Sequence, residues 1–72
     1  MKYIVIELQT AWDGTVANLV TAYADRLEAE RQYHLVLAAA AVSGLLCHAA
    51  VLMTSEGQVL ESRHYNNLPE YA

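Results

Sequence analysis

The sequence lacks most of the features with which very small domains gain extra stability. It contains one cysteine, Cys47, so an intramolecular disulfide is impossible, and its potential metal ligands are few. A chain of 72 residues buries only about 60% of the surface that its unfolded form exposes, which leaves its stability marginal. Small domains usually compensate with disulfides, a metal or association. Because 56% of the residues are apolar, the sequence predicts a homodimer or a higher homo-oligomer.

Basic residues are also scarce: there are four, against eight acidic residues. Binding of DNA or RNA normally needs clustered Lys and Arg that displace phosphate counterions. Lys2, Arg26, Arg31 and Arg63 are scattered along the chain, which argues against a nucleic-acid partner. The N-terminus shows no signal-peptide pattern. One cysteine and no export signal fit a reducing compartment, so we expect a cytoplasmic protein.

Charged residues are absent from residues 32–55, which make up a third of the chain. Residues 35–53 approach the length of a membrane span, and their Leu and Val side chains favour insertion by about 2–5 kcal/mol in total. His48, Ser43 and Gly44 offset part of this gain, and Lys or Arg anchors are sparse. A membrane-associated protein stays an alternative. We predict instead that Gly44 separates the end of a helix from a central strand, with no membrane partner.

Apolar alternation predicts strands at residues 2–9, 15–23, 45–54 and 58–65, and a helix at 26–43. This order is a ββαββ pattern of the α+β class. A right-handed crossover through the helix leaves room for the first strand between the second and the third. The predicted sheet is therefore antiparallel, with strand order 2-1-3-4 and the helix on one face. We expect one domain at residues 1–65 and a C-terminal tail at residues 66–72.

Turn and cap residues support these boundaries. Asp13-Gly14 is typical of a hairpin turn, and residues 55–57 predict a three-residue hairpin loop with Gly57 in a left-handed conformation. Asp25 is expected to cap the helix by accepting from the amide at its third position, and Gly44 suits the residue just beyond the helix. The expected buried stripe of the helix consists of Ala29, Tyr33, Val36 and Ala40, widened by Leu37 and Ala41.

The predicted third strand is apolar on both faces, although one helix can cover only one face of the sheet. An exposed apolar patch of several hundred Å² is a liability in a monomer, and a second copy packed sheet on sheet would bury it. The predicted homo-oligomer interface consists of Tyr3, Val5, Leu45, Cys47, Ala49, Val51, Met53 and Tyr65.

Two histidines are the candidates for metal binding. Adjacent Cys47 and His48 point to opposite faces of a strand and cannot share one ion. If Thr54 pairs with Gln58, His48 lies opposite His64 at about 5 Å between Cβ atoms, which is half of a zinc site. We expect no metal, no other cofactor and no catalytic residues. The alternative is a small-molecule or metal-binding protein or enzyme with a site at the dimer interface near this pair.

Six segments of the sequence carry a resemblance to known proteins: residues 1–10 (MKYIVIELQT), 13–16, 33–34, 38–43, 48–52 and 56–57. In these segments the sequence resembles small uncharacterised proteins of Gram-positive gut bacteria that are often encoded in prophages or mobile elements. These segments are spread over residues 1–57, whereas Trp12, Cys47 and the tail fall outside the resemblance. It implies an intracellular accessory protein and supplies no catalytic residues. We therefore expect a non-catalytic protein that self-associates and binds a host or virion protein.

Overall fold

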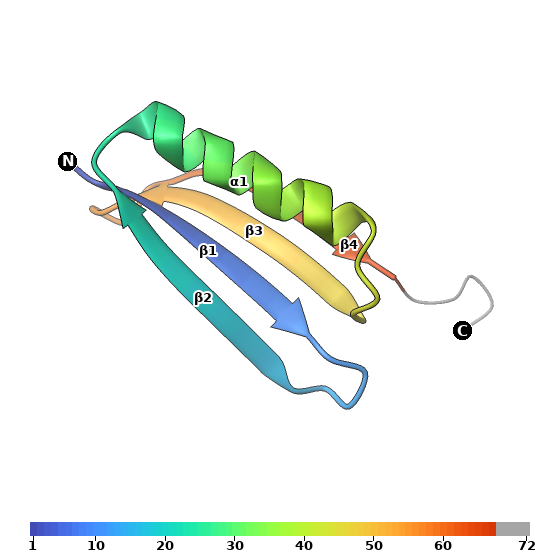
Figure 1. The fold of residues 1–72 in the computed structure, drawn as a ribbon. Helices are drawn as coiled ribbons and strands as arrows, with labels where there is room; N and C mark the ends of the chain where they lie inside the picture. Colours follow the sequence, from blue (N-terminus) through green and yellow to red (C-terminus); the bar gives the residue numbers. More distant parts are fainter. Residues whose placement is uncertain (68–72) are drawn as a thin grey trace.

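The computed structural model describes residues 1–67, which form a four-stranded antiparallel sheet with one helix across one face (Figure 1). The elements follow one another as β1 (Tyr3–Thr10), β2 (Val16–Tyr23), α1 (Arg26–Ala41), β3 (Cys47–Thr54) and β4 (Val59–Asn66). The strand order is β2-β1-β3-β4, which confirms the predicted ββαββ topology. Within the described part of the chain, no helix is both long and apolar enough to cross a bilayer.

The predicted tail begins later than expected. Asn66 is the last residue of β4, and the Asn67 side chain donates to the carbonyl oxygens of Ser43 and Leu45, at 2.9 Å each. These two bonds, together with one from the Asn67 backbone to Leu46, hold the end of β4 against the loop that precedes β3. Residues 68–72, the rest of the predicted tail, lie outside the described residues.

Two glycines close the two hairpins as predicted. Gly14 and Gly57 have φ angles of +90° and +97°, a region that residues with a Cβ rarely adopt. Gly44 does not adopt this left-handed conformation, because among residues 1–67 only Gly14 and Gly57 have a positive φ. Helix α1 ends instead in a tightened last turn, in which Ser43 donates its amide to Ala40. As a result α1 is shorter than predicted, and β3 begins at Cys47.

The start of α1 and its buried stripe follow the sequence pattern. The Asp25 carboxylate accepts from the amide of Leu27 at 3.0 Å, so the cap bonds the second amide of the helix and not the third. The stripe that faces the sheet matches the predicted one except for Ala41, which is exposed. Its buried residues are Ala29, Tyr33, Val36, Leu37 and Ala40.

The hydrophobic core lies between α1 and the two central strands. Val5 of β1 and Leu52 of β3 are opposite each other in the sheet and are 2% and 0% exposed. Ala50 and the alanines of the helix stripe let α1 approach the sheet closely, and the Tyr33 ring fills the space between the layers. Burial raises the pKa of the Tyr33 hydroxyl above its ordinary value. The core therefore occupies one face of the sheet only.

Candidate functional site

The sheet face opposite α1 is the main surface without a covering layer, and we call it the open face. In antiparallel strands, residues directly opposite each other point to the same face. Ile6 lies opposite Val20 of β2 and Val51 of β3, so these three side chains form the centre of the open face. By the same registers and that of β3 with β4, its apolar residues are Ile4, Ile6, Leu8, Val16, Val20, Ala22, Cys47, Ala49, Val51, Met53 and Val59.

Charge is distributed over the two sheet faces in the reverse of the usual way. The strands carry three charged side chains, Glu7, Glu61 and Arg63. Glu7 and Arg63 lie opposite Ala50, and Glu61 lies opposite Leu52, so all three are on the face that α1 covers. An antiparallel sheet normally turns its polar face to water. Here the open face of the four described strands has no Asp, Glu, Lys or Arg side chain.

Four of the eight predicted interface residues lie on the open face. Cys47, Ala49, Val51 and Met53 lie together on the open face, as expected. Leu45 lies in the loop before β3 and is not part of the strand.

Tyr3, Val5 and Tyr65 lie on the helix side, where Val5 is in the core and the two tyrosines pack against it. The prediction failed because both faces of β1 are apolar, and alternation alone does not say which face the helix covers. The helix covers the face that carries Val5, Ala50 and Leu52. The side chains of Ile4, Ile6 and Leu8 are on the other face and stay uncovered.

A second feature is a polar cluster within the helix side of the sheet. His48 Nε2 lies 2.6 Å from Glu7 Oε2, and the Gln9 amide donates to the same carboxylate oxygen at 3.0 Å. An ionised carboxylate only accepts hydrogen bonds, so Nε2 carries the proton of this contact. His48 is 4% exposed, and its buried Nδ1 has no partner among residues 1–67.

Sequence reasoning missed the Glu7–His48 contact. Its signal was present, because β1 contains one charged residue and β3 contains one histidine, and the predicted strand order makes these strands neighbours. Gln9 and His48 are directly opposite each other, and Glu7 reaches His48 along the diagonal. Beside the cluster, a pocket of about 200 Å³ opens toward β2 and is lined by Glu7, Gln9, Ala17, Asn18 and Leu19.

The cluster lowers the pKa of Glu7. Burial alone raises this pKa, but the hydrogen bonds from His48 and Gln9, together with the electrostatic attraction of the His48 ring, outweigh burial. The pKa of the exposed Asp13 carboxylate is also lowered, because it accepts a hydrogen bond from the Thr15 amide. Both carboxylates therefore favour the folded state when ionised.

We expect the free energy of unfolding to fall as the pH drops below 4.5, the ordinary glutamate pKa. Below that value the unfolded chain binds more protons than the folded chain until the lowered pKa of Glu7 is passed, so stability is lost with acid. Urea unfolding at a series of pH values should show that acid lowers the free energy of unfolding less for Glu7→Gln than for the unaltered protein. Asp13→Asn is the control for the second carboxylate, and parallel curves for Glu7→Gln and the unaltered protein would contradict the assignment.

The predicted opposition of His48 and His64 is wrong. Thr54 does bond Gln58, at 2.8 Å, but the β3–β4 register shifts by one residue between Leu52 and Met53. Beyond this bulge His48 lies opposite Tyr65, and His64 lies opposite Ala49 on the open face. The two imidazoles therefore point to opposite sides of the sheet. Among residues 1–67, no three His, Cys, Asp or Glu side chains are placed to hold a metal ion.

Trp12 connects the β1–β2 hairpin to the loop after α1. Its indole N–H donates to the carbonyl oxygen of Gly44 at 2.8 Å, although the residue is more than half exposed. Trp12 thus has a partner 32 positions away in the sequence. Its ring does not belong to the open face, because it lies beyond the end of β1.

No protein-family model, curated protein or solved structure matches this chain. The resemblance to small proteins of Gram-positive gut bacteria therefore stays a prediction.

Proposed function

We propose that this protein is a non-catalytic interaction protein that self-associates by packing the open faces of two copies against each other. The single observation that carries the proposal is the placement of charge. All three charged side chains of the strands lie under or beside α1, and none lies on the uncovered face. A surface without charge meets a second copy of itself without like-charge repulsion, as a twofold contact requires.

The size of the open face is consistent with this occupant. Four strands of eight residues cover roughly 26 Å by 19 Å, or about 500 Å² per copy. Two copies would bury about 1,000 Å² in total, which is at the lower end for a specific interface. Sheet-on-sheet packing at about 10 Å would add the second layer that Ile6 and Val51 lack. We therefore expect a reversible dimer.

Light scattering coupled to size exclusion, over concentrations from about 1 µM to about 100 µM, tests the proposal. The unaltered protein should shift from monomer to dimer as its concentration rises. Ile6→Lys places an ammonium at the centre of the open face and should remove the face-to-face contact, because the charge would be buried without a partner. The mass that this variant reaches at about 100 µM should therefore be lower than that of the unaltered protein. Leu35→Lys makes the same charge change on the exposed surface of α1 and should leave the shift in place.

Both variants must remain folded for this comparison to be valid. Circular dichroism should show that both keep the strand and helix signals of the unaltered protein, because Ile6 is only partly buried and lies outside the core, and Leu35 is exposed. A monomer at every concentration would overturn the proposal, and so would an equal loss of dimer in both variants.

On the resemblance alone, we also propose that the protein acts in the bacterial cytoplasm as an accessory protein of a phage or mobile element. Its partner there would be a host or virion protein. What supports this part is the similarity over residues 1–10 and the five shorter segments. Affinity purification from a native host, with Ile6→Lys as the comparison, tests whether such a partner uses the open face.

A further inference from the structure

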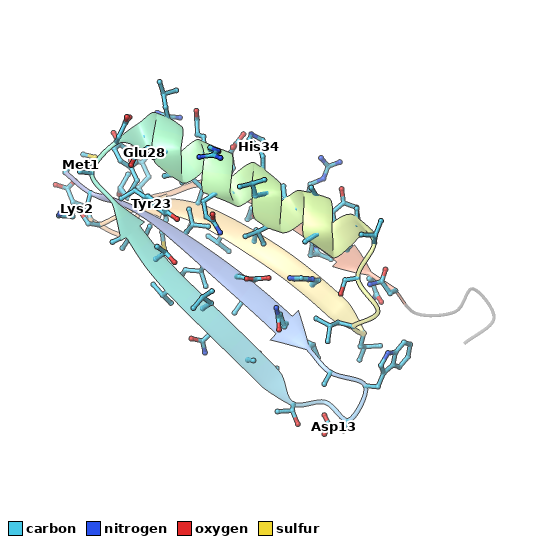
Figure 2. The ribbon with its side chains drawn as sticks, viewed as in Figure 1. Met1, Lys2, Asp13, Tyr23, Glu28 and His34 are labelled. Carbon is cyan, nitrogen blue, oxygen red and sulfur yellow. The ribbon has the colours of Figure 1, made fainter. Side chains whose placement is uncertain are left out.

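Strand β2 forms one edge of the sheet, and no other strand or helix of residues 1–67 lies along its outer side. Figure 1 shows no element beside it, and Figure 2 labels Asp13 and Tyr23 near its two ends. Val16, Leu19 and Val20 are each between 57% and 59% exposed. Edge strands with unpaired peptide groups are templates for pairing with another strand.

The two edges of the sheet are protected to very different degrees. Strand β4 carries Glu61 and Arg63, and a register shift interrupts its pairing with β3. Charges and bulges are the usual devices that keep an edge from pairing. Strand β2 has eight residues, no charged residue and no proline, and its register with β1 is unbroken. The edge formed by β2 is therefore open to a strand, and that formed by β4 is not.

The direction of the free peptide groups follows from the β1–β2 hairpin. The Ala11 amide donates to the Thr15 carbonyl at 2.8 Å, so these two residues form a hydrogen-bonded pair. In an antiparallel ladder such pairs alternate with non-bonded ones. The peptide groups of the odd-numbered residues of β2 therefore point to β1. The peptide groups of its even-numbered residues point outward, and these residues are Val16, Asn18, Val20 and Ala22.

We infer that β2 pairs antiparallel with β2 of a second copy, about a twofold axis between the two Leu19 residues. This register places Val16 opposite Ala22 of the second copy and Asn18 opposite Val20. All four outward peptide groups of each strand are then satisfied, with about eight new hydrogen bonds in total. Moving the axis to Asn18 or Val20 leaves one of the four pairs unmade within β2. The two Leu19 side chains meet on the helix side, at about 5 Å between Cβ atoms.

A second copy fits this edge better than an unrelated peptide for two reasons. The strand can pair with its own sequence in the antiparallel register, and β2 itself contains no charged residue. The pairing also joins two open faces into one, because the residues with outward peptide groups are those whose side chains lie on the open face. The paired sheet would have eight strands, with both helices on one side and an uncharged face on the other.

This edge interface is distinct from the face-to-face contact proposed above, and cysteine cross-linking separates the two. Leu19→Cys in a Cys47→Ala background should form a disulfide-linked dimer when the protein is oxidised with diamide. Two open faces packed together would instead leave both Leu19 positions on the outer surfaces, on the helix side. Arg63→Cys in the same background is the matched control, because it lies on the helix side of the opposite edge.

The expected result is a cross-linking rate at least tenfold higher for Leu19→Cys than for Arg63→Cys. Equal rates would overturn the edge pairing and leave the face-to-face proposal intact. Amide hydrogen exchange on the unaltered protein is the second measurement. The amides of Asn18 and Val20 should become protected as the concentration rises, whereas fast exchange at every concentration would also overturn the inference. Leu19→Lys should lose this protection, and Ile6→Lys should keep it.

Discussion

Replacing Leu52 with alanine should lower the free energy of unfolding by about 2–5 kcal/mol. Leu52 is fully buried, and it packs in the cluster that joins Val5 of β1 to the helix stripe. Removing its branched end leaves a cavity that Ala50 and the alanines of α1 are too small to fill. Domains of this size have total stabilities near the low end of about 5–15 kcal/mol, so the loss approaches the whole. Urea unfolding followed by circular dichroism measures it.

Leu27→Ala is the matched control for this prediction. Leu27 is 73% exposed on the first turn of α1, so the same truncation should change the free energy of unfolding by no more than about 0.5 kcal/mol. A Leu52→Ala protein that unfolds at the same urea concentration as Leu27→Ala would show that the core is not between α1 and the central strands. Because the open face does not include Leu52, any dimer should weaken only through loss of folded protein.

Breaking the contact between Glu7 and His48 should have the second largest effect. Glu7→Ala leaves His48 Nε2 without an acceptor, while Nδ1 already has no partner among the described residues. A buried donor without a partner costs about 1–3 kcal/mol, so Glu7→Ala should be destabilised by that amount. Glu7→Gln keeps an acceptor oxygen near His48 and should lose less. Chemical denaturation at neutral pH ranks the three proteins.

The double variant Glu7→Ala/His48→Leu separates this contact from general loss of packing. Leucine removes both ring nitrogens, so the double variant should be more stable than Glu7→Ala alone. Replacing a buried polar pair by apolar side chains is often neutral or stabilising. If the two single effects simply add, the 2.6 Å contact contributes nothing of its own and the interpretation of the cluster is wrong.

The open face and the β2 edge are two parts of the sheet that no other element covers within residues 1–67. Helix α1 covers the face with Val5 and Leu52 and leaves the face with Ile6 and Val51 as a single layer. Edge pairing would double the uncharged area that each assembly offers to another, from about 500 Å² to about 1,000 Å². Light scattering would then show species larger than a dimer when both interfaces form.

The local part of the fold could be predicted from the sequence. Asp13-Gly14 predicted a hairpin turn and Gly57 a left-handed loop residue, and the apolar residues on either side of these turns predicted the strands. The apolar stripe around Tyr33 predicted the buried side of α1. The preference for right-handed crossovers then predicted the strand order β2-β1-β3-β4. Each of these rests on neighbours along the chain or on a general rule of connection.

The assignment of partners across the sheet depended on tertiary structure. Strands β1 and β3 are apolar on both faces. The alternation of side chains therefore separates the two faces but does not show which one the helix covers. The close approach of α1 to Ala50 decided this, and it moved Val5 into the core and Ile6 to the open face. One extra residue near Leu60 shifted the register of β4 and sent His48 and His64 to opposite sides.

The sequence by itself therefore determined the elements, their order and the excess of apolar surface over what one helix can cover. Only the tertiary structure decided which surface is left uncovered, that it is free of charge, and that Glu7 is the partner of His48. The physical reason is that alternation and turn chemistry act between residues near in sequence. The choice of covered face and the bulge in β4 instead depend on how layers pack and on which strand carries the extra residue.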